Sequence, residues 1–326
     1  MMQRRKLATV ALLAASSLAL ATGVALAQQR LFFGIATGGT GGTYYPLGGM
    51  LAQLISNKAT VAGQKVSATA EAAGASVGNA KLLGNKEIES AFVAADIMDA
   101  AYNGAGQFQG APIKNLRALG ALYPETVQLI TRADFNINSV RDLKGKSISS
   151  GAPGSGQYQL LTDLLKVYGM SRSDIKEDLS SFTQAVDKIK DGNLHATLIT
   201  AGVPTAAVTD FAQSHALKVI PLTGAEIAEL RKQQPYYAEV PLPANTYKGQ
   251  TAAVPTLAVM AVWATHDALP EGVAYEVTKA LYENTAIMGQ VHVQGKNIQL
   301  STATAVGTVP FHPGAARYLK EKGVLK

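Results

Sequence analysis

A run of small residues near the start of the chain is the first candidate site. Residues 37–43 read TGGTGGT, four glycines and three threonines. The apolar run 31–35 before it predicts a strand, and Leu47, Leu51 and Leu54 after it recur at helical spacing. Between a strand and a helix, such a loop lets backbone N–H groups and the helix N-terminus converge on one point, where a negative charge is stabilised. The pattern therefore predicts binding of an anion.

Other interpretations of this loop are less favoured. A flexible linker seldom leads directly into a Tyr-Tyr-Pro sequence, residues 44–46, and an amphipathic helix. The dinucleotide motif G-x-G-x-x-G does not fit, because the third residue after Gly41 is Tyr44. The phosphate motif G-x-x-x-x-G-K-[ST] does not fit residues 145–147 (GKS) either, because its first glycine is replaced by Val140. Nucleotide binding is therefore not expected.

Two later loops repeat the arrangement. Residues 151–156 (GAPGSG) follow a predicted strand at 146–150 and precede a leucine-rich helix. Residues 201–204 (AGVP) follow a predicted strand at 195–200. Ligands of open α/β sheets bind beyond the carboxyl ends of the strands, where all these loops are expected to lie.

Three polar side chains beside the loops have two interpretations each. Asp96 follows a predicted strand at 88–94 and begins a helix, so it is either an N-cap, the favoured interpretation, or a partner for the ammonium group of a ligand. Tyr44 and Tyr45 either pack in the core or supply hydroxyl donors and a wall to the cleft, and we expect at least one to line it.

Catalytic and metal-binding patterns are missing from the sequence. The five histidines are dispersed, with no H-E-x-x-H, and the chain has no cysteine. Ser155 fails the G-x-S-x-G pattern because position 153 is Pro153. We expect no enzyme, no cofactor and no metal.

The predicted ligand-binding residues come from the loops of two predicted lobes. They are Thr37, Gly38, Gly39, Thr40, Gly41, Thr43, Tyr44, Tyr45, Ala73, Ser76, Asp96, Gly151, Gly154, Ser155, Gly156, Gly202 and Pro204.

The N-terminus predicts export. Residues 4–6 (RRK), an apolar run at 7–26 and an A-x-A site at 25–27 are typical of a cleaved secretory signal peptide, with an uncleaved anchor as the alternative. Removal of residues 1–27 lowers the formal net charge from +6 to +3, because they hold three cations and no anion. The remaining charges are scattered, so no nucleic-acid partner is expected. We expect a periplasmic, soluble protein.

Strands and helices alternate along the rest of the chain, which predicts an α/β fold with parallel strands and two lobes. Lobe I is expected at residues 28–127 and, together with C-terminal helices, at 259–326. Lobe II is expected at 128–258. A strand at 116–122 is expected to precede crossing strands at 126–131 and 256–265, which would join the lobes as a hinged clamp around a cleft. The second crossing, the return strand to lobe I, contains the single tryptophan, Trp263.

The chain resembles the TAXI family, the solute receptors of tripartite ATP-independent periplasmic (TRAP) transporters. The opening motif of residues 38–49 (GGTGGTYYPLGG) is similar to that family's opening signature, and 122–126 (LYPET), 142–146 (DLKGK), 153–156 (PGSG) and 312–315 (HPGA) follow in a similar order and spacing. The similarity covers essentially the whole chain after the signal peptide, and within the family it is greatest to the branch that includes the Brucella 31 kDa immunogenic protein.

The resemblance implies a periplasmic-binding-protein-like fold of type II and a function in transport. A small anionic solute, such as glutamate, 2-oxoglutarate or a related amino or keto acid, would be captured and handed to a fused membrane permease by a monomeric receptor. Residues 94–95 (AA) and 74–75 (GA) differ from the family's usual Gln-Ser and Asn-Gly, which leaves the ligand open. A ligand sensor or surface antigen that uses the same clamp is the alternative, and a periplasmic enzyme is the least favoured.

Overall fold

The computed structural model describes residues 31–326. The predicted signal peptide, residues 1–27, lies outside the described residues. No helix within residues 31–326 combines the length and the apolar character needed to cross a membrane.

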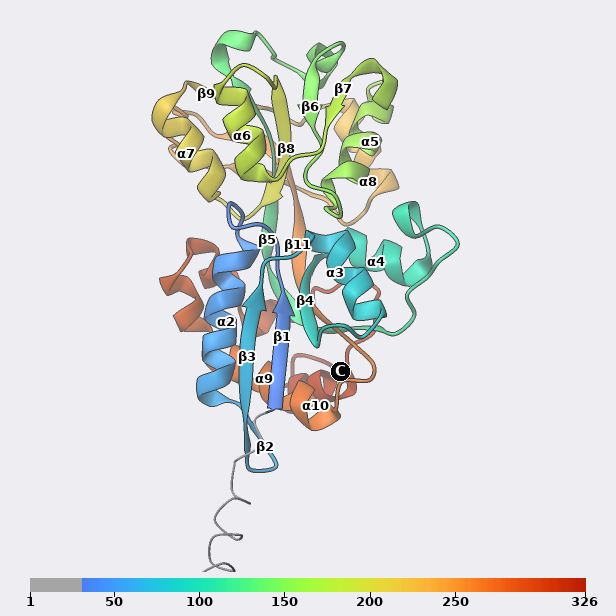
Figure 1. Ribbon diagram of the computed structural model, residues 1–326. Coiled ribbons are helices and arrows are strands. Elements are labelled where there is room, and N and C mark those ends of the chain that lie inside the picture. The colour runs from blue at the N-terminus through green and yellow to red at the C-terminus, as the bar shows by residue number, and fades with distance from the viewer. Residues whose placement is uncertain (1–30) are drawn as a thin grey trace, which may run out of the picture.

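The described chain forms two groups of elements at opposite ends of one sheet (Figure 1). Lobe I comprises β1 (Leu31–Ala36), α2 (Tyr44–Lys58), β2 (Thr60–Val61), β3 (Gln64–Glu71), α3 (Ala75–Gly84), β4 (Ser90–Ala94), α4 (Ala95–Asn103), α9 (Glu271–Tyr282) and α10 (Pro313–Glu321). Lobe II comprises β6 (Ser147–Ser149), α5 (Gln157–Val167), β7 (Lys176–Asp178), α6 (Phe182–Lys190), β8 (Ala196–Ala201), α7 (Ala206–Ser214), β9 (Leu217–Ile220) and α8 (Ala225–Gln233). Short 3-10 helices lie at Gly106–Phe108, Ala133–Phe135, Val140–Leu143, Arg172–Asp174, Thr285–Gln290, Val293–Asn297 and Leu300–Thr302.

Two long strands connect the lobes, β5 (Leu116–Arg132) and β11 (Val254–His266). A third strand, β10 (Ala238–Leu242), pairs with the first residues of β11. The strand order is β2-β3-β1-β4-β11-β5-β8-β6-β7, with β10 on β11 and β9 on β5. Because β11 pairs with β4 of lobe I and β5 pairs with β8 and β9 of lobe II, the antiparallel β5 and β11 carry the sheet from one lobe to the other.

The first crossing is longer than the sequence predicted. Separate strands at 116–122 and 126–131 were expected, whereas β5 is one strand of 17 residues. The intervening Pro124 lies opposite Met260 of β11, next to a register shift in the ladder. A proline is tolerated in a sheet at such an irregularity, because the regular hydrogen-bond pattern is already interrupted there.

The buried hydrophobic residues of the described chain form three clusters. One buried cluster packs α2, α9 and α10 against one face of lobe I, and a second packs α6 and α7 in lobe II. A third cluster contains residues of both lobes, including Met98 of α4 and Leu164 of α5. Within lobe I the strand pairs β1–β3 and β1–β4 are parallel, as the alternating pattern predicted, so the loops after them reach the edge that faces lobe II.

Candidate functional site

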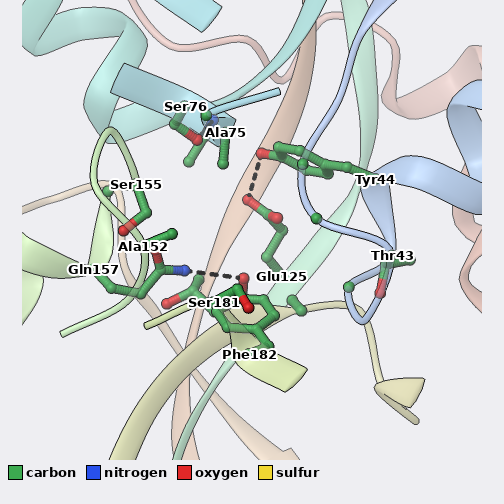
Figure 2. A pocket seen from close by; sticks show the side chains of 18 of the residues that line it. Thr43, Tyr44, Ala75, Ser76, Glu125, Ala152, Ser155, Gln157, Ser181 and Phe182 are labelled. Carbon is green, nitrogen blue, oxygen red and sulfur yellow. Dashed lines mark hydrogen bonds between the residues drawn. The ribbon is translucent and has the colours of Figure 1, made fainter. Parts of the chain in front are cut away.

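A cavity of about 330 Å³ lies where the strand-end loops of the two lobes meet. Lobe I contributes residues 38–44, 73–76, 94, 96 and 97, and lobe II contributes residues from 152–160, 181–183 and 200–201. Glu125 and Val259, from the crossing strands, also line the cavity, as does Tyr237, which precedes β10. Groups of both lobes and of the crossings therefore surround the same space (Figure 2).

The first turns of several helices line this cavity. Those of α2, α3 and α4 come from lobe I, and those of α5 and α6 come from lobe II. The N-terminus of α6 is capped by Ser181 in a capping box with Gln184. The N-caps of α2 and α5, Thr43 and Gly156, make no side-chain capping hydrogen bond. Because unpaired N–H groups at a helix start carry partial positive charge, these two helices favour an anion in the cavity from opposite sides.

Many of the predicted ligand-binding residues are brought together here. Those that line the cavity are Gly38, Gly39, Thr40, Gly41, Thr43, Tyr44, Ala73, Ser76, Asp96, Ser155 and Gly156. Asp96 occupies the first turn of α4, but the N-cap of that helix is Ala94, so the favoured interpretation of Asp96 as an N-cap is not what the structure shows.

Three predicted residues lie outside the lining because their local structure turns them away. Thr37 is fully buried, and its hydroxyl donates to the Glu71 carbonyl at 2.7 Å. Tyr45, the neighbour of Tyr44 on α2, has 39% of its surface exposed. Gly151 adopts a positive φ of 87°, which places it in the turn before the loop residues that do line the cavity.

The other three predicted residues, Gly154, Gly202 and Pro204, make hydrogen bonds between the lobes through their carbonyl groups. The Gly154 carbonyl accepts hydrogen bonds from the N–H groups of Val77 and Gly78, both at 2.9 Å, so a loop of lobe II caps α3 of lobe I. A second backbone bond joins the Ala207 N–H to the Gly41 carbonyl at 3.1 Å. The described arrangement is therefore one in which the lobes are in contact across the cavity.

Two side chains add to this contact on the α2 side. The Thr43 hydroxyl donates to the Gly202 carbonyl at 3.0 Å. The carbonyl of Pro204 lies 2.9 Å from Nε2 of His292. Because Nδ1 of His292 accepts from the Gln294 N–H, the neutral tautomer with its proton on Nε2 satisfies both contacts.

Glu125 and Tyr237 are among the lining residues that were not predicted from the sequence. Glu125 has 3% of its surface exposed, and its Oε2 accepts a hydrogen bond from the Tyr44 hydroxyl at 3.0 Å (Figure 2). The Tyr237 hydroxyl donates to Oδ2 of Asp96 at 2.7 Å. An acid within a long apolar run was the available signal for Glu125, whereas nothing in the sequence around Tyr237 indicated its position.

The cavity thus contains two carboxyl groups, that of the buried Glu125 and that of the partly buried Asp96. Burial raises the pKa of Glu125 well above its usual range, against the hydrogen bond from Tyr44. Burial also raises the pKa of Asp96, while the Tyr237 hydroxyl and the first-turn N–H groups of α4 act in the opposite direction. Of the described residues that line the cavity, none is lysine, arginine or histidine.

Several polar atoms of the lining have no partner within the described part of the chain. They are Oδ1 of Asp96, Oγ of Ser155, Oε1 of Gln157 and Oγ1 of Thr200. Buried polar groups in proteins are normally hydrogen-bonded, so unpaired ones that share a cavity are available for a ligand. Residues 31–326 place no group of three histidine, aspartate or glutamate side chains where it could hold a metal ion.

Comparison with known proteins gives one family and one fold. A model of the NMT1-like family matches residues 35–323. A protein of Bordetella bronchiseptica is similar in structure, with a TM-score of 0.52 and 16% identity over 90% of this chain and 89% of that one. PhnD1 of Prochlorococcus marinus, solved with methylphosphonate, has a TM-score of 0.52 and 11% identity over 83% and 91%. The periplasmic aliphatic sulphonate binding protein SsuA of Escherichia coli has a TM-score of 0.49 and 15% identity over 91% and 80%. The predicted periplasmic-binding-protein-like α/β fold is confirmed.

Proposed function

This chain belongs to the NMT1-like family, and from that premise we propose that it is a periplasmic receptor that captures a small carboxylate between its two lobes. The ligand is an amino or keto acid of the size of glutamate or 2-oxoglutarate. The receptor delivers it to the membrane permease of a TRAP transporter, in the manner of the TAXI family that the sequence resembles.

The observation that carries this proposal is the pair of uncapped helix starts facing one cavity. Each of α2 and α5 follows a loop rich in glycine, and the two helices belong to different lobes. A charge-assisted hydrogen bond contributes about 1.5–3 kcal/mol. Four to six such bonds are enough for the roughly 8 kcal/mol of micromolar binding after ordering costs.

The remaining polar groups suit the rest of such a ligand. Oδ1 of Asp96 is buried without a partner and can accept a hydrogen bond from an ammonium group. The hydroxyl groups of Ser155 and Thr200 can bind carboxylate or carbonyl oxygens. PhnD1, which shares the fold, was solved with another small acid, methylphosphonate.

Capture by closure follows from the same arrangement. Neither glycine loop alone can surround a small acid, and β5 and β11 are the strands about which the lobes would move. We propose that ligand shifts an existing open population toward the closed one, with lobe I formed by residues 28–127 and 259–326 and lobe II by residues 128–258.

A thermal-shift panel tests the ligand class. The panel contains L-glutamate, L-glutamine, 2-oxoglutarate and succinate, with a neutral sugar and a divalent cation as controls. A ligand at 100 times its Kd adds about 2.7 kcal/mol of apparent stability, so at least one of the acids is expected to raise the melting temperature. Melting that all four acids leave unshifted, together with a clear shift by the sugar or the cation, would overturn the proposal.

A further inference from the structure

The two carboxyl groups of the cavity lie in different surroundings. Asp96 is in the first turn of α4, where N–H groups and the helix dipole stabilise a negative charge, and it also accepts a hydrogen bond from Tyr237. Glu125 is in the middle of strand β5, which has no comparable dipole. Within the described residues, the one hydrogen bond to its carboxyl group comes from the Tyr44 hydroxyl. The ionised form is therefore better supported at Asp96 than at Glu125.

The groups that face Glu125 offer it no positive charge. They are Tyr44 from α2, Asp96 from α4, Tyr237 from the segment before β10, and Tyr123 from its own strand. Three of these are phenols, which are neutral at physiological pH, and the fourth is an acid. A second negative charge beside Asp96 in a buried cavity is disfavoured both by burial and by repulsion. Both effects raise the pKa of Glu125.

We propose that Glu125 binds the ligand as a neutral carboxylic acid. Its Oε2 accepts from Tyr44, and the proton on Oε1 is donated to an oxygen of the bound acid. This inference deepens the proposed function and rests on it, because it identifies how a site for an anion uses a buried acidic side chain. Asp96 remains ionised and is free to receive a cationic group of the same ligand.

The donated proton makes binding depend on pH in one direction. Below the pKa of Glu125 the acid is protonated and the hydrogen bond forms. As the pH rises through that raised pKa, the proton is lost, the donor disappears and a carboxylate faces the ligand's own negative charge. The affinity then falls by up to about tenfold per pH unit, since one proton must be taken up for each ligand bound.

Calorimetric titration with L-glutamate over neutral and alkaline pH tests this, with Glu125→Gln as the matched variant. Glutamine has the shape of the neutral acid and keeps an N–H donor. The wild-type affinity is expected to fall with rising pH, whereas E125Q binds at low pH within a few-fold of the wild type and lacks that fall. The ligand's own titration affects the wild type and E125Q equally, so the difference between the two proteins reports the titration of Glu125. An affinity that does not change with pH in the wild type, or that rises, contradicts the proposal, as does a folded E125Q that no longer binds.

An infrared difference spectrum separates this inference from the function it rests on. The spectrum of the wild type minus that of E125Q, both recorded without added ligand at neutral pH, is expected to show the C=O band of one protonated carboxylic acid. If none of the acids binds but the band is present, the proposed ligand class fails and the protonated Glu125 stands. If the band is absent, the inference fails whichever ligands bind. Should E125Q not fold, Asp96→Asn replaces it, and the band of the wild type must then convert to carboxylate at lower pH in D96N, because a neighbouring negative charge has been removed.

Discussion

At the scale of single residues, the hydrogen bond between Tyr237 and Asp96 joins the crossing region to lobe I. Tyr237 is 5% exposed, and its hydroxyl is the one side-chain donor to Oδ2 of Asp96 in the described chain. Removing that hydroxyl leaves a buried carboxylate with one donor fewer, at a cost of about 1–3 kcal/mol.

We therefore expect Tyr237→Phe to lower the free energy of unfolding by that amount and to weaken ligand binding several-fold, measured by chemical denaturation and calorimetry. Tyr45→Phe is the matched control, because Tyr45 lies outside the cavity with 39% of its surface exposed. Equal effects of the two substitutions would contradict the role given to the Tyr237 hydroxyl.

Single residues also show where the sequence was informative. The glycine loop of residues 37–43 could be located because strand, small residues and helical spacing follow each other within a short segment. The places of Glu125 and Tyr237 in the cavity could not be located from the sequence. Both residues reach the cavity through the pairing of β5, β11 and β10, which join residues far apart in the chain. Tyr44 and Tyr45 show how finely the sequence can place single side chains. They are adjacent residues of one helix that face different surroundings, and of the two only Tyr44 lines the cavity.

At the scale of elements, the loop before α2 approaches lobe II closely. A methyl group added to Gly41 would overlap the Thr183 side chain and lie 3.3 Å from the Cβ of Ala207. A methyl group added to Gly39, in the same loop, would meet nothing within 4 Å. Both glycines line the cavity. Comparing an alanine at each position therefore separates the effect of the contact with lobe II from the effect of changing any residue of the loop.

Gly41→Ala is expected to hold the lobes apart and to weaken ligand binding by about 1–3 kcal/mol, the usual cost of overpacking. Gly39→Ala is expected to bind as the wild type does. Calorimetric titration with the same ligand measures both. Unchanged affinity in Gly41→Ala would show that the contact with lobe II is not needed for binding.

The contact between the 151–156 loop and α3 gives a second prediction. Gly154 has a φ of 86°, and its Cβ would lie 3.0 Å from the carbonyl oxygen of Gly74 in lobe I. Gly169, at the end of α5, has a φ of 71° and open space around it. An alanine in the left-handed region costs about 1–2 kcal/mol at either position.

Gly154→Ala and Gly169→Ala are therefore expected to lower the free energy of unfolding similarly, while only Gly154→Ala lowers ligand affinity. Denaturation and calorimetry measure the two effects separately. A loss of affinity in both variants, in proportion to their lost stability, would mean that the 151–156 loop has no special part in closure.

Helices were predicted well where a regular hydrophobic pattern continued. Strands were predicted less well where pairing with a distant strand determined their length. The helices expected after the two glycine loops are present as α2 and α5. The division of β5 into two strands was wrong, because Pro124 resembles a break in the sequence and is accommodated only by the irregular ladder with β11.

At the scale of the whole molecule, closure is the motion on which the account depends. Trp263, the single tryptophan, had been expected in the return strand and lies there, in β11. Its indole is fully buried in the core of lobe I, with its ring centroid 6.2 Å from that of Phe33. We therefore expect its emission to change little when ligand binds, so scattering is the stricter measurement of closure.

Small-angle X-ray scattering of the mature protein, with and without a saturating acid from the panel, measures closure itself. The radius of gyration is expected to decrease on binding in the wild type, because ligand bridges the N-termini of α2 and α5 and draws the lobes together. In Gly154→Asp, whose added side chain would crowd the Gly74 carbonyl oxygen of lobe I, both affinity and the decrease are expected to be lost. An unchanged radius of gyration at saturation, together with full affinity in Gly154→Asp, would contradict the clamp and favour a site within lobe I alone.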